Sequence, residues 1–374
     1  MKILFLARSL DVGGAERQLV VLTAGLRRKG HLVKVAIFYE GGPLELELNA
    51  SDVPVIHLNK KGRWDILGFL VRLIRAIRQE APDVIYGWMI IPNVILAFLK
   101  PFFPSVYLVW GIRTSYLNMN LYAWPPRLAY RLEVWLSRWA NLIICNSWAG
   151  MEYSLKHGLP GKKMLVIPNG IDVQYFKHNP EAGKAVREGW HVREDEKLIG
   201  LVARLDPLKD HPIFLRAAAL LKKEHPNLRF VCIGDGPDPY KTDLMRLAES
   251  LDLGDCLTWA GERLEMPAVY NALDILVSSS AGEGFPNSVG EAMACGIPCV
   301  VTDVGDAARI VGGTGVIISP KDQFALQNGV VSILECLETD RNFDAGRIRD
   351  RIVDNYNVEL MVLKTIEVLE VAER

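Results

Sequence analysis

Two glutamates separated by seven residues form the most specific chemical feature of this sequence. Glu283 and Glu291 lie in the segment Ser278-Ser-Ser-Ala-Gly-Glu-Gly-Phe-Pro-Asn-Ser-Val-Gly-Glu-Ala-Met-Ala-Cys-Gly-Ile-Pro298. A carboxylate can accept two hydrogen bonds from vicinal hydroxyls, so one glutamate could hold a ribose and the other a hexose. Alone, each would more simply be a loop carboxylate or a partner of a helix dipole. That simpler interpretation explains the paired spacing and the Gly-Phe-Pro-Asn turn poorly.

The residues around this pair predict a short helix. We expect Ser288 to cap its N-terminus, Gly296 to form a left-handed C-terminal cap, and Pro298 to prevent continuation. Glu291 would then lie in the first turn and Glu283 in the preceding loop. Because a helix N-terminus can receive a phosphate, sugar, diphosphate and ribose would lie along one line.

A basic pair and a glycine loop could bind an anion. Arg204 and Lys209 follow a strand expected at residues 198–203, where a guanidinium fork and a point charge could clamp a diphosphate. Such residues are usually surface charges, but their place at a strand end favours binding. The loop with Gly13 and Gly14 could bring backbone N–H groups to an anion. It could equally be a tight turn in which Glu16 complements the helix dipole.

Apolar runs of strand length alternate with helical stretches along the whole chain. This pattern predicts an α/β fold with two doubly wound Rossmann-like domains facing a central cleft, with ligands at the carboxyl ends of the strands. The expected strands are residues 2–7, 33–38, 83–88, 106–110, 142–145, 198–203, 228–233, 257–260, 274–278 and 298–301. We expect a first domain at 1–168, a linker region at 169–197, a second domain at 198–355, and a helix at 356–374 that packs back on the first domain.

Composition narrows the cellular context. The chain has 374 residues, half of them apolar, and six cysteines without CxxC spacing, which argues against disulfide scaffolds and zinc ribbons. The apolar start is too short for a signal peptide, so a cytoplasmic location is expected. Through Asp172 there are 21 basic and 12 acidic residues (+9), against 22 and 32 in the remainder (−10). The basic half would face an anionic partner or simply have a solvated basic surface.

Tryptophans add a membrane signal to the basic half. Seven of the nine tryptophans precede residue 150. A helix expected near residues 64–78 carries Trp64, Leu67, Phe69, Leu70 and Ile74 and is surrounded by Lys60, Lys61, Arg63, Arg72, Arg75 and Arg78. Residues 122–131 form a second candidate. Such helices suit a membrane interface, although a core-facing helix with a basic outer face explains the first one alone. We expect peripheral association with the anionic inner face of the cell membrane.

The motifs together resemble those of the retaining glycosyltransferases of family 4, the group 1 enzymes with the GT-B fold. The resemblance covers essentially the whole chain, through GGAERQ (13–18), PNGID (168–172), VARLDPLKD (202–210), GDGP (234–237) and EGFPNSVGEAMACG (283–296). It implies that the N-terminal domain at 1–168 is the acceptor-side domain and that the domain at 198–355 binds the nucleotide sugar. It also implies that Arg204 and Lys209 hold the donor diphosphate and that the Gly14 N–H closes on it from the other domain.

The resemblance also assigns the sugar and nucleotide contacts. Glu283 would bind the transferred sugar together with the backbone of 285–287, Glu291 would bind the ribose, and Arg263 would lie near the base. The implied catalytic residues are Glu283, Arg204, Lys209 and Arg113. The implied donor-binding residues are Gly14, Arg204, Lys209, Arg263, Glu283, Gly284, Phe285, Pro286, Asn287, Ser288 and Glu291.

The chain departs from the family at one position. Many members carry a histidine near the end of the fourth or fifth strand, whereas this sequence reads Val109-Trp-Gly-Ile-Arg-Thr114. Arg113 would be the cationic substitute, contacting donor or acceptor, or it would belong to a structural ion pair. No histidine has metal-ligand spacing and no DxD triad stands at a strand end, so a metal-independent enzyme is expected.

These observations lead to one preferred function and two rivals. The protein would transfer a hexose from a UDP- or GDP-sugar to a glycan or polyprenyl-linked acceptor in surface polysaccharide or glycolipid synthesis, with retention at the anomeric carbon. It would need no further cofactor and no nucleic acid partner. The rivals are a sugar nucleotide 2-epimerase, for which no pair of histidine and carboxylate is evident, and a binding protein without turnover.

Overall fold

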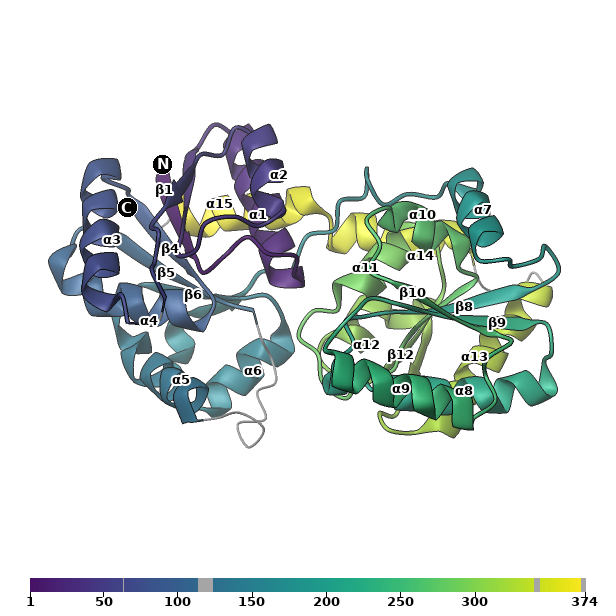
Figure 1. Cartoon of the computed structure of the whole chain (residues 1–374). Helices are drawn as coiled ribbons and strands as arrows, with labels where there is room; N and C mark the ends of the chain where they lie inside the picture. The colour runs from purple at the N-terminus through teal and green to yellow at the C-terminus, as the bar shows by residue number, and fades with distance from the viewer. Residues whose placement is uncertain (63, 114–123, 340–343, 371–374) are drawn as a thin grey trace. The chain divides into compact units, whose positions relative to one another are not determined.

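The chain forms two compact α/β units, Met1–Gly170 with Val358–Arg374, and Ile171–Asn357 (Figure 1). This computed structural model describes residues 1–62, 64–113, 124–339 and 344–370, and side chains at 124–127 are not described. Arg63 and residues 122–127 of the second membrane candidate therefore lie wholly or partly outside the described structure. The segment 169–197, expected as a linker, contains helix α7 (Pro180–Gly189), and all of it from Ile171 onward belongs to the second unit.

The first unit is a parallel sheet with strand order β3-β2-β1-β4-β5-β6-β7. Its elements are β1 (Lys2–Ala7), α1 (Gly14–Arg28), β2 (Leu32–Ile37), α2 (Leu44–Ala50), β3 (Val55–His57), α3 (Ile66–Glu80), β4 (Val84–Trp88), α4 (Ile90–Leu99), β5 (Tyr107–Ile112), α5 (Trp124–Leu136), β6 (Leu142–Cys145), α6 (Trp148–Lys156), β7 (Met164–Val166) and α15 (Val358–Glu370). Two hydrophobic clusters pack the sheet. One includes side chains of α1, α2 and α15, and the other includes side chains of α3 and α4.

The helix α15 belongs to the first unit although it comes from the end of the chain. Met361, Val362 and Leu369 are buried with α1 side chains such as Leu22. A Cβ at Gly25 of α1 would lie 2.3 Å from Val362 Cγ2, so only glycine permits this close helix contact. The chain therefore enters the second unit after Gly170 and leaves it before Val358.

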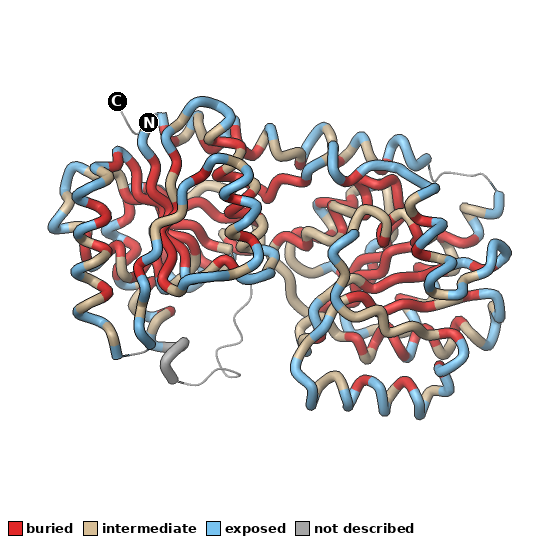
Figure 2. Tube along the Cα trace, turned by 45° about the horizontal axis from the view of Figure 1, so that its top comes forward, coloured by how far each residue is buried: buried red, intermediate tan, exposed pale blue. Residues whose placement is uncertain are grey.

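The second unit is a parallel sheet with strand order β10-β9-β8-β11-β12-β13. Besides α7, its elements are β8 (Lys197–Val202), α8 (His211–Glu224), β9 (Leu228–Ile233), α9 (Asp238–Ser250), β10 (Leu257–Gly261), α10 (Met266–Ala272), β11 (Ile275–Ser278), α11 (Asn287–Ala294), β12 (Cys299–Thr302), α12 (Ala307–Val311), β13 (Val316–Ile318), α13 (Gln323–Glu338) and α14 (Ala345–Asn355). Side chains of α10, α11 and α14 share one core cluster, and those of α8, α9 and α13 share another. Helices thus cover both faces, and Figure 2 shows buried strands inside each unit. The two Rossmann-like domains predicted from the sequence are confirmed.

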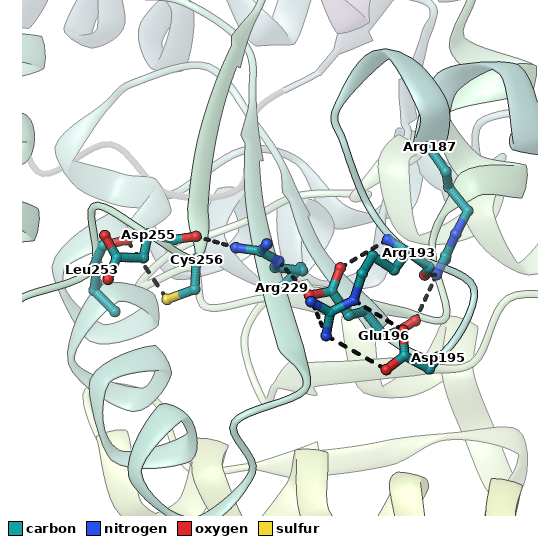
Figure 3. A network of polar contacts seen from close by, with 8 residues as sticks. All are labelled: Arg187, Arg193, Asp195, Glu196, Arg229, Leu253, Asp255 and Cys256. Atoms are coloured by element: carbon teal, nitrogen blue, oxygen red, sulfur yellow. Dashed lines mark hydrogen bonds and ion pairs between the residues drawn. The ribbon is translucent and has the colours of Figure 1, made fainter.

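A polar network holds the amino ends of β8 and β9 together (Figure 3). Glu196, only 3% exposed, accepts hydrogen bonds from Arg229 Nε (2.9 Å) and from the Arg193 N–H (2.8 Å). Arg187 donates to the Glu196 carbonyl (2.6 Å), and Arg193 also pairs with Asp195. A buried carboxylate needs such partners, because an unpaired charge is costly to bury. This charged cluster is structural, since it lies at the sheet edge opposite the carboxyl ends of these strands.

Strand order indicates where each sheet can bind a ligand. In both sheets the order reverses direction beside the first strand, between β1 and β4 and between β8 and β11. Loops that leave the carboxyl ends of such neighbouring strands diverge to opposite faces and leave a crevice for ligands. The residues that follow β8 and β11 are therefore the first to inspect.

Candidate functional site

The loops after β8 and β11 bring two of the predicted residues into direct contact. Lys209 lies in the turn before α8, and its Nζ is 2.5 Å from Glu283 Oε1. Ser280 donates a second hydrogen bond to the same oxygen (2.7 Å). The Lys209 and Glu283 side chains are 27% and 10% exposed. A cation and a carboxylate at a strand-end crevice can together hold a phosphate and a sugar hydroxyl.

Backbone contacts fix these two loops against each other. Ser279 Oγ donates to the carbonyls of Lys209 (3.0 Å) and Asp210 (3.1 Å). The Ala281 N–H donates to the Leu208 carbonyl (2.8 Å). The charged pair is therefore positioned by the protein itself, which is what preorganised electrostatic stabilisation requires.

Arg204 lies on the same strand-end loop and reaches into solvent. Its side chain is 73% exposed, and Nη2 lies 2.7 Å from Asp206 Oδ2. The GDGP turn supports this loop from behind, because the Leu205 N–H donates to the Asp235 carbonyl (2.9 Å). Gly234 has φ +130°, and a Cβ there would lie 2.1 Å from the Ala203 carbonyl oxygen. Glycine is needed at this turn for the arginine loop to take its place.

The helix that carries Glu291 starts earlier than the sequence suggests. α11 begins at Asn287, and Pro286, at the N-cap, makes no side-chain hydrogen bond. The Pro286 carbonyl accepts a hydrogen bond from the Val289 N–H (3.2 Å). Ser288 therefore already lies inside the first turn and cannot be the N-cap. The Ser288 cap was therefore wrong, and Glu291 lies in the second turn. The left-handed conformation of Gly296 (φ +83°) is confirmed.

Glu291 has a buried partner that sequence reasoning missed. The Tyr270 hydroxyl on α10 donates to Glu291 Oε2 over 2.6 Å, and the tyrosine is fully buried. Burial, aided by the Glu291 charge, raises the Tyr270 pKa well above its usual value, so the phenol is the proton donor. The available signal was a tyrosine in a short apolar helix, since a buried tyrosine hydroxyl usually requires a partner.

The Gly-Phe-Pro-Asn segment is held by the following loop and the core. Phe285 is 6% exposed and packs edge-on against Tyr356 at 5.6 Å between ring centroids. The Asp306 N–H donates to the Gly284 carbonyl (2.9 Å). Gly305 has φ +58°, and a Cβ there would lie 2.4 Å from the Glu283 carbonyl oxygen. The Phe285 ring is therefore a core anchor, and this residue could offer only its backbone to a ligand.

Arg263 follows β10 and stands apart from these contacts. Its guanidinium pairs with Glu265 on its own loop and lies 6.0 Å from the centre of the Trp190 ring. Its partners among the described residues do not include Lys209, Glu283 or Glu291.

In the first unit, the predicted glycine loop leads directly into a helix. α1 begins at Gly14, and its N-cap Gly13 is extended and makes no side-chain cap. A Cβ at Gly13 would lie 2.2 Å from Glu16 Oε2, so the glycine lets this carboxylate fold back toward the helix N-terminus. Glu16 thus complements the helix dipole at the end where an anion could also bind.

Arg113 immediately follows β5 and is held by neutral groups. Its guanidinium stacks on Trp88 at 3.6 Å from the ring centre, and it donates to Tyr86 Oη (3.2 Å) and Asn169 Oδ1 (3.3 Å). Burial lowers the pKa of Arg113. No carboxylate of the described residues pairs with it, which disfavours the structural ion pair. A cation held only by dipoles and an aromatic face can still attract an anion.

The described part of the chain contains neither a candidate metal cluster nor a helix that could span a membrane. Among the described residues, no three histidine, cysteine, aspartate or glutamate side chains lie close enough together to hold a metal ion. The helices of this part of the chain include none with the length and apolar character needed to cross a membrane.

Two parallel Rossmann-like units, with strand-end charges and the paired glutamates, define a GT-B glycosyltransferase architecture. The family model for group 1 glycosyl transferases matches residues 196–336, and the model for glycosyltransferase family 4 matches residues 12–175. The chain therefore belongs to the group 1, family 4 glycosyltransferases, as its motifs predicted.

Solved structures and curated relatives agree with this assignment. HepE of Anabaena, solved with UDP and with UDP-glucose, is 25% identical with a TM-score of 0.86, and the match covers 99% of this chain and 99–100% of that one. The UDP-Gal:alpha-D-GlcNAc-diphosphoundecaprenol alpha-1,3-galactosyltransferase of Escherichia coli is 26% identical over 62% of this chain and 61% of its own length. The D-inositol 3-phosphate glycosyltransferase of Mycolicibacterium smegmatis is 32% identical over 53% and 46%. The matches thus span about half to three fifths of these two relatives.

Proposed function

We propose that this protein transfers a hexose from a UDP- or GDP-sugar to a hydroxyl of a glycan or polyprenyl-linked glycan, with retention at the anomeric carbon. The observation that carries the proposal is the fixed Lys209–Glu283 pair beside Arg204 at the carboxyl ends of β8 and β11. HepE, whose fold this chain shares, was solved with UDP-glucose, and the Escherichia coli relative is named for a diphosphoundecaprenol-linked acceptor. These names support a role in surface polysaccharide or glycolipid synthesis.

Each site residue has a distinct task in this reaction. Lys209 and Arg204 neutralise the diphosphate as the glycosidic bond to the sugar breaks, and N–H groups at the start of α11 add a helix N-terminus. Glu283 holds hydroxyls of the sugar while positive charge develops at its ring. Glu291, oriented by Tyr270, binds the ribose. Arg263 lies near the base.

The first unit supplies the remaining groups. The Gly14 N–H approaches the diphosphate, and Arg113 is the cation near the reacting sugar. The leaving phosphate can itself take the acceptor proton on the same face, so no side-chain base is required. Because Arg204 and Lys209 provide the positive charge, the reaction needs no metal ion. The enzyme works at the anionic inner surface of the cell membrane, where polyprenyl-linked acceptors are found.

The test is a panel of nucleoside diphosphate sugars with a mixture of polyprenyl-linked and soluble glycan acceptors. We expect release of UDP or GDP that depends on the acceptor, and a product whose anomeric configuration by NMR equals that of the donor. Interconversion of the donor without an acceptor would instead indicate an epimerase. Tight donor binding without any turnover would indicate a binding protein. Inversion at the anomeric carbon would refute the retaining mechanism.

A further inference from the structure

Helix α3 has exposed apolar side chains on its outer side, in addition to those that pack into the core. Its sheet-facing side chains Phe69, Leu73, Ala76 and Ile77 are buried, and α3 runs along one flank of the first unit (Figure 1). On the outer side, Trp64 is 85% exposed, Ile66 53%, Leu67 80% and Val71 55%. Phe69, expected from the sequence to share the interfacial face, belongs to the core. The exposed apolar side chains are therefore not needed to pack α3 against the sheet. We call them the outer apolar patch.

Cations border this apolar patch at both ends. Lys60 and Lys61 precede it, and the exposed Arg75 and Arg78 follow it on the same helix. From residue 60 to the end of α3 there are six basic side chains and two acids, Asp65 and Glu80, and Glu80 pairs with Lys34 on β2. Asp65 already pairs with Arg72 and accepts a hydrogen bond from the Lys61 N–H (2.9 Å), contacts that hold the pKa of Asp65 below its usual value. The surface therefore combines exposed apolar side chains with an uncompensated positive charge.

We propose that the outer face of α3, with Trp64, Leu67 and Val71 at its centre, is the surface by which this protein docks on an anionic phospholipid leaflet. Charge complementarity selects this occupant, because flanking lysine and arginine can meet lipid phosphates while tryptophan and leucine enter the headgroup boundary. The proposal rests on the proposed function, which places the acceptor in a membrane, and it identifies the surface that reaches it.

The distribution of charge along α3 also predicts its orientation. A helix of 15 residues is about 22 Å long. Lys60 and Lys61 lie beyond one end and Arg78 near the other, so only an axis parallel to the membrane brings both cationic groups to the headgroups together. Insertion is then shallow, and attraction should weaken as salt shortens the Debye length.

The experiment is co-sedimentation of the full chain with vesicles of phosphatidylcholine alone or mixed equally with phosphatidylglycerol. We expect binding only to the mixed vesicles, and release by salt. Leu67→Glu should lower the partition coefficient about tenfold, because it removes an apolar side chain that enters the headgroup boundary. The double variant Lys61→Gln, Arg75→Gln should lower it about thirtyfold, near fivefold for each cation.

Matched controls separate this face from general charge and hydrophobicity. Leu46 of α2 is 75% exposed and that helix packs with the other core cluster of the unit, so Leu46→Glu should bind like wild type. Arg28 lies at the exposed end of α1, so Arg28→Gln should lower the partition coefficient at most a few-fold. Trp64→Phe should retain binding but lose the part of the tryptophan fluorescence that brominated lipids quench.

Several outcomes would overturn the assignment. They are equal binding of Leu67→Glu and Leu46→Glu, undiminished quenching in Trp64→Phe, binding to neutral vesicles, or a change of oligomeric state in Leu67→Glu, which would indicate a second copy on this face. Turnover of soluble acceptors without vesicles should be unchanged in every α3 variant. Absence of turnover in wild type that still binds vesicles through α3 would refute the proposed function and leave this surface intact.

Discussion

The hydrogen bond from Tyr270 to Glu291 gives a sharp test of the nucleotide site. Tyr270→Phe removes one oxygen from a fully buried ring and leaves the edge-on contact with Phe176 (5.8 Å) in place. The variant should therefore fold, with a free energy of unfolding about 1 kcal/mol lower than that of wild type. The Glu291 carboxylate loses the donor 2.6 Å away that restricts its rotation.

The size of the effect follows from the kind of bond removed. A hydrogen bond to a charged acceptor contributes about 1.5–3 kcal/mol. Ribose hydroxyls and water can still reach the carboxylate, so the lower end applies, equivalent to about tenfold weaker nucleotide binding. Ribose contacts are similar in the ground state and the transition state, so KM for the donor should rise while kcat stays within about twofold.

Calorimetry with nucleoside diphosphates and their 2′,3′-dideoxy analogues measures the effect at its source. Wild type should bind the nucleoside diphosphate more tightly than its dideoxy analogue, and Tyr270→Phe should reduce this ratio of affinities about tenfold. Glu291→Ala should abolish the preference, and the double variant should resemble Glu291→Ala, because the tyrosine acts only through the glutamate. Tyr356→Phe removes another hydroxyl of the same unit, bonded to the Arg309 carbonyl (3.2 Å), and is the matched control. An unchanged preference in Tyr270→Phe would refute this positioning role.

Three other expectations concern the clamp, metals and pH. Arg204→Ala and Lys209→Ala should each lower kcat about a hundredfold in steady-state assays at saturating donor, and wild-type rates in either would remove the diphosphate clamp. Activity should persist in EDTA, so a loss that magnesium or manganese restores would contradict the metal-independent reaction. Burial raises the pKa of Glu133 to about 7 from 4.5, so the folded state retains its proton and loses stability as pH rises between those values. In urea titrations, Glu133→Gln should gain about 3 kcal/mol over wild type between pH 4.5 and 8, and a difference independent of pH would exclude this cause.

The architecture was predictable because its central strands are buried on both faces. Runs such as residues 2–7 and 228–233 are almost entirely apolar, as strands of a parallel sheet covered by helices must be. The strands β3, β7 and β13 were not predicted. Each has only three residues and lies at a sheet edge, where partial exposure removes the continuous apolar signal. The helix at the end of the chain was expected to pack back on the first domain, and α15 does pack against α1, more than 300 residues away in sequence.

The site was predictable where its chemistry follows a strand end. Arg204, Lys209 and Glu283 could be placed because charged residues directly after buried strands must lie at one edge of the sheet. Tyr270 could not, because a buried aromatic in a short helix has the pattern of a core residue. Arg113 shows the same difficulty, since its partners, Tyr86 and Trp88 on β4 and the distant Asn169, carry no charge that would mark them.

The Lys209–Glu283 pair has a consequence for how a donor would be recognised. Both side chains are largely shielded from water, and separating them in that setting costs free energy unless each gains a new partner. A nucleoside diphosphate offers a phosphate to Lys209 but nothing that replaces the lysine at Glu283. A free sugar offers hydroxyls to Glu283 but no anion for Lys209. A molecule with sugar and diphosphate joined offers a partner to each side chain at once, so the ion pair would favour the intact donor over the nucleoside diphosphate that the reaction releases.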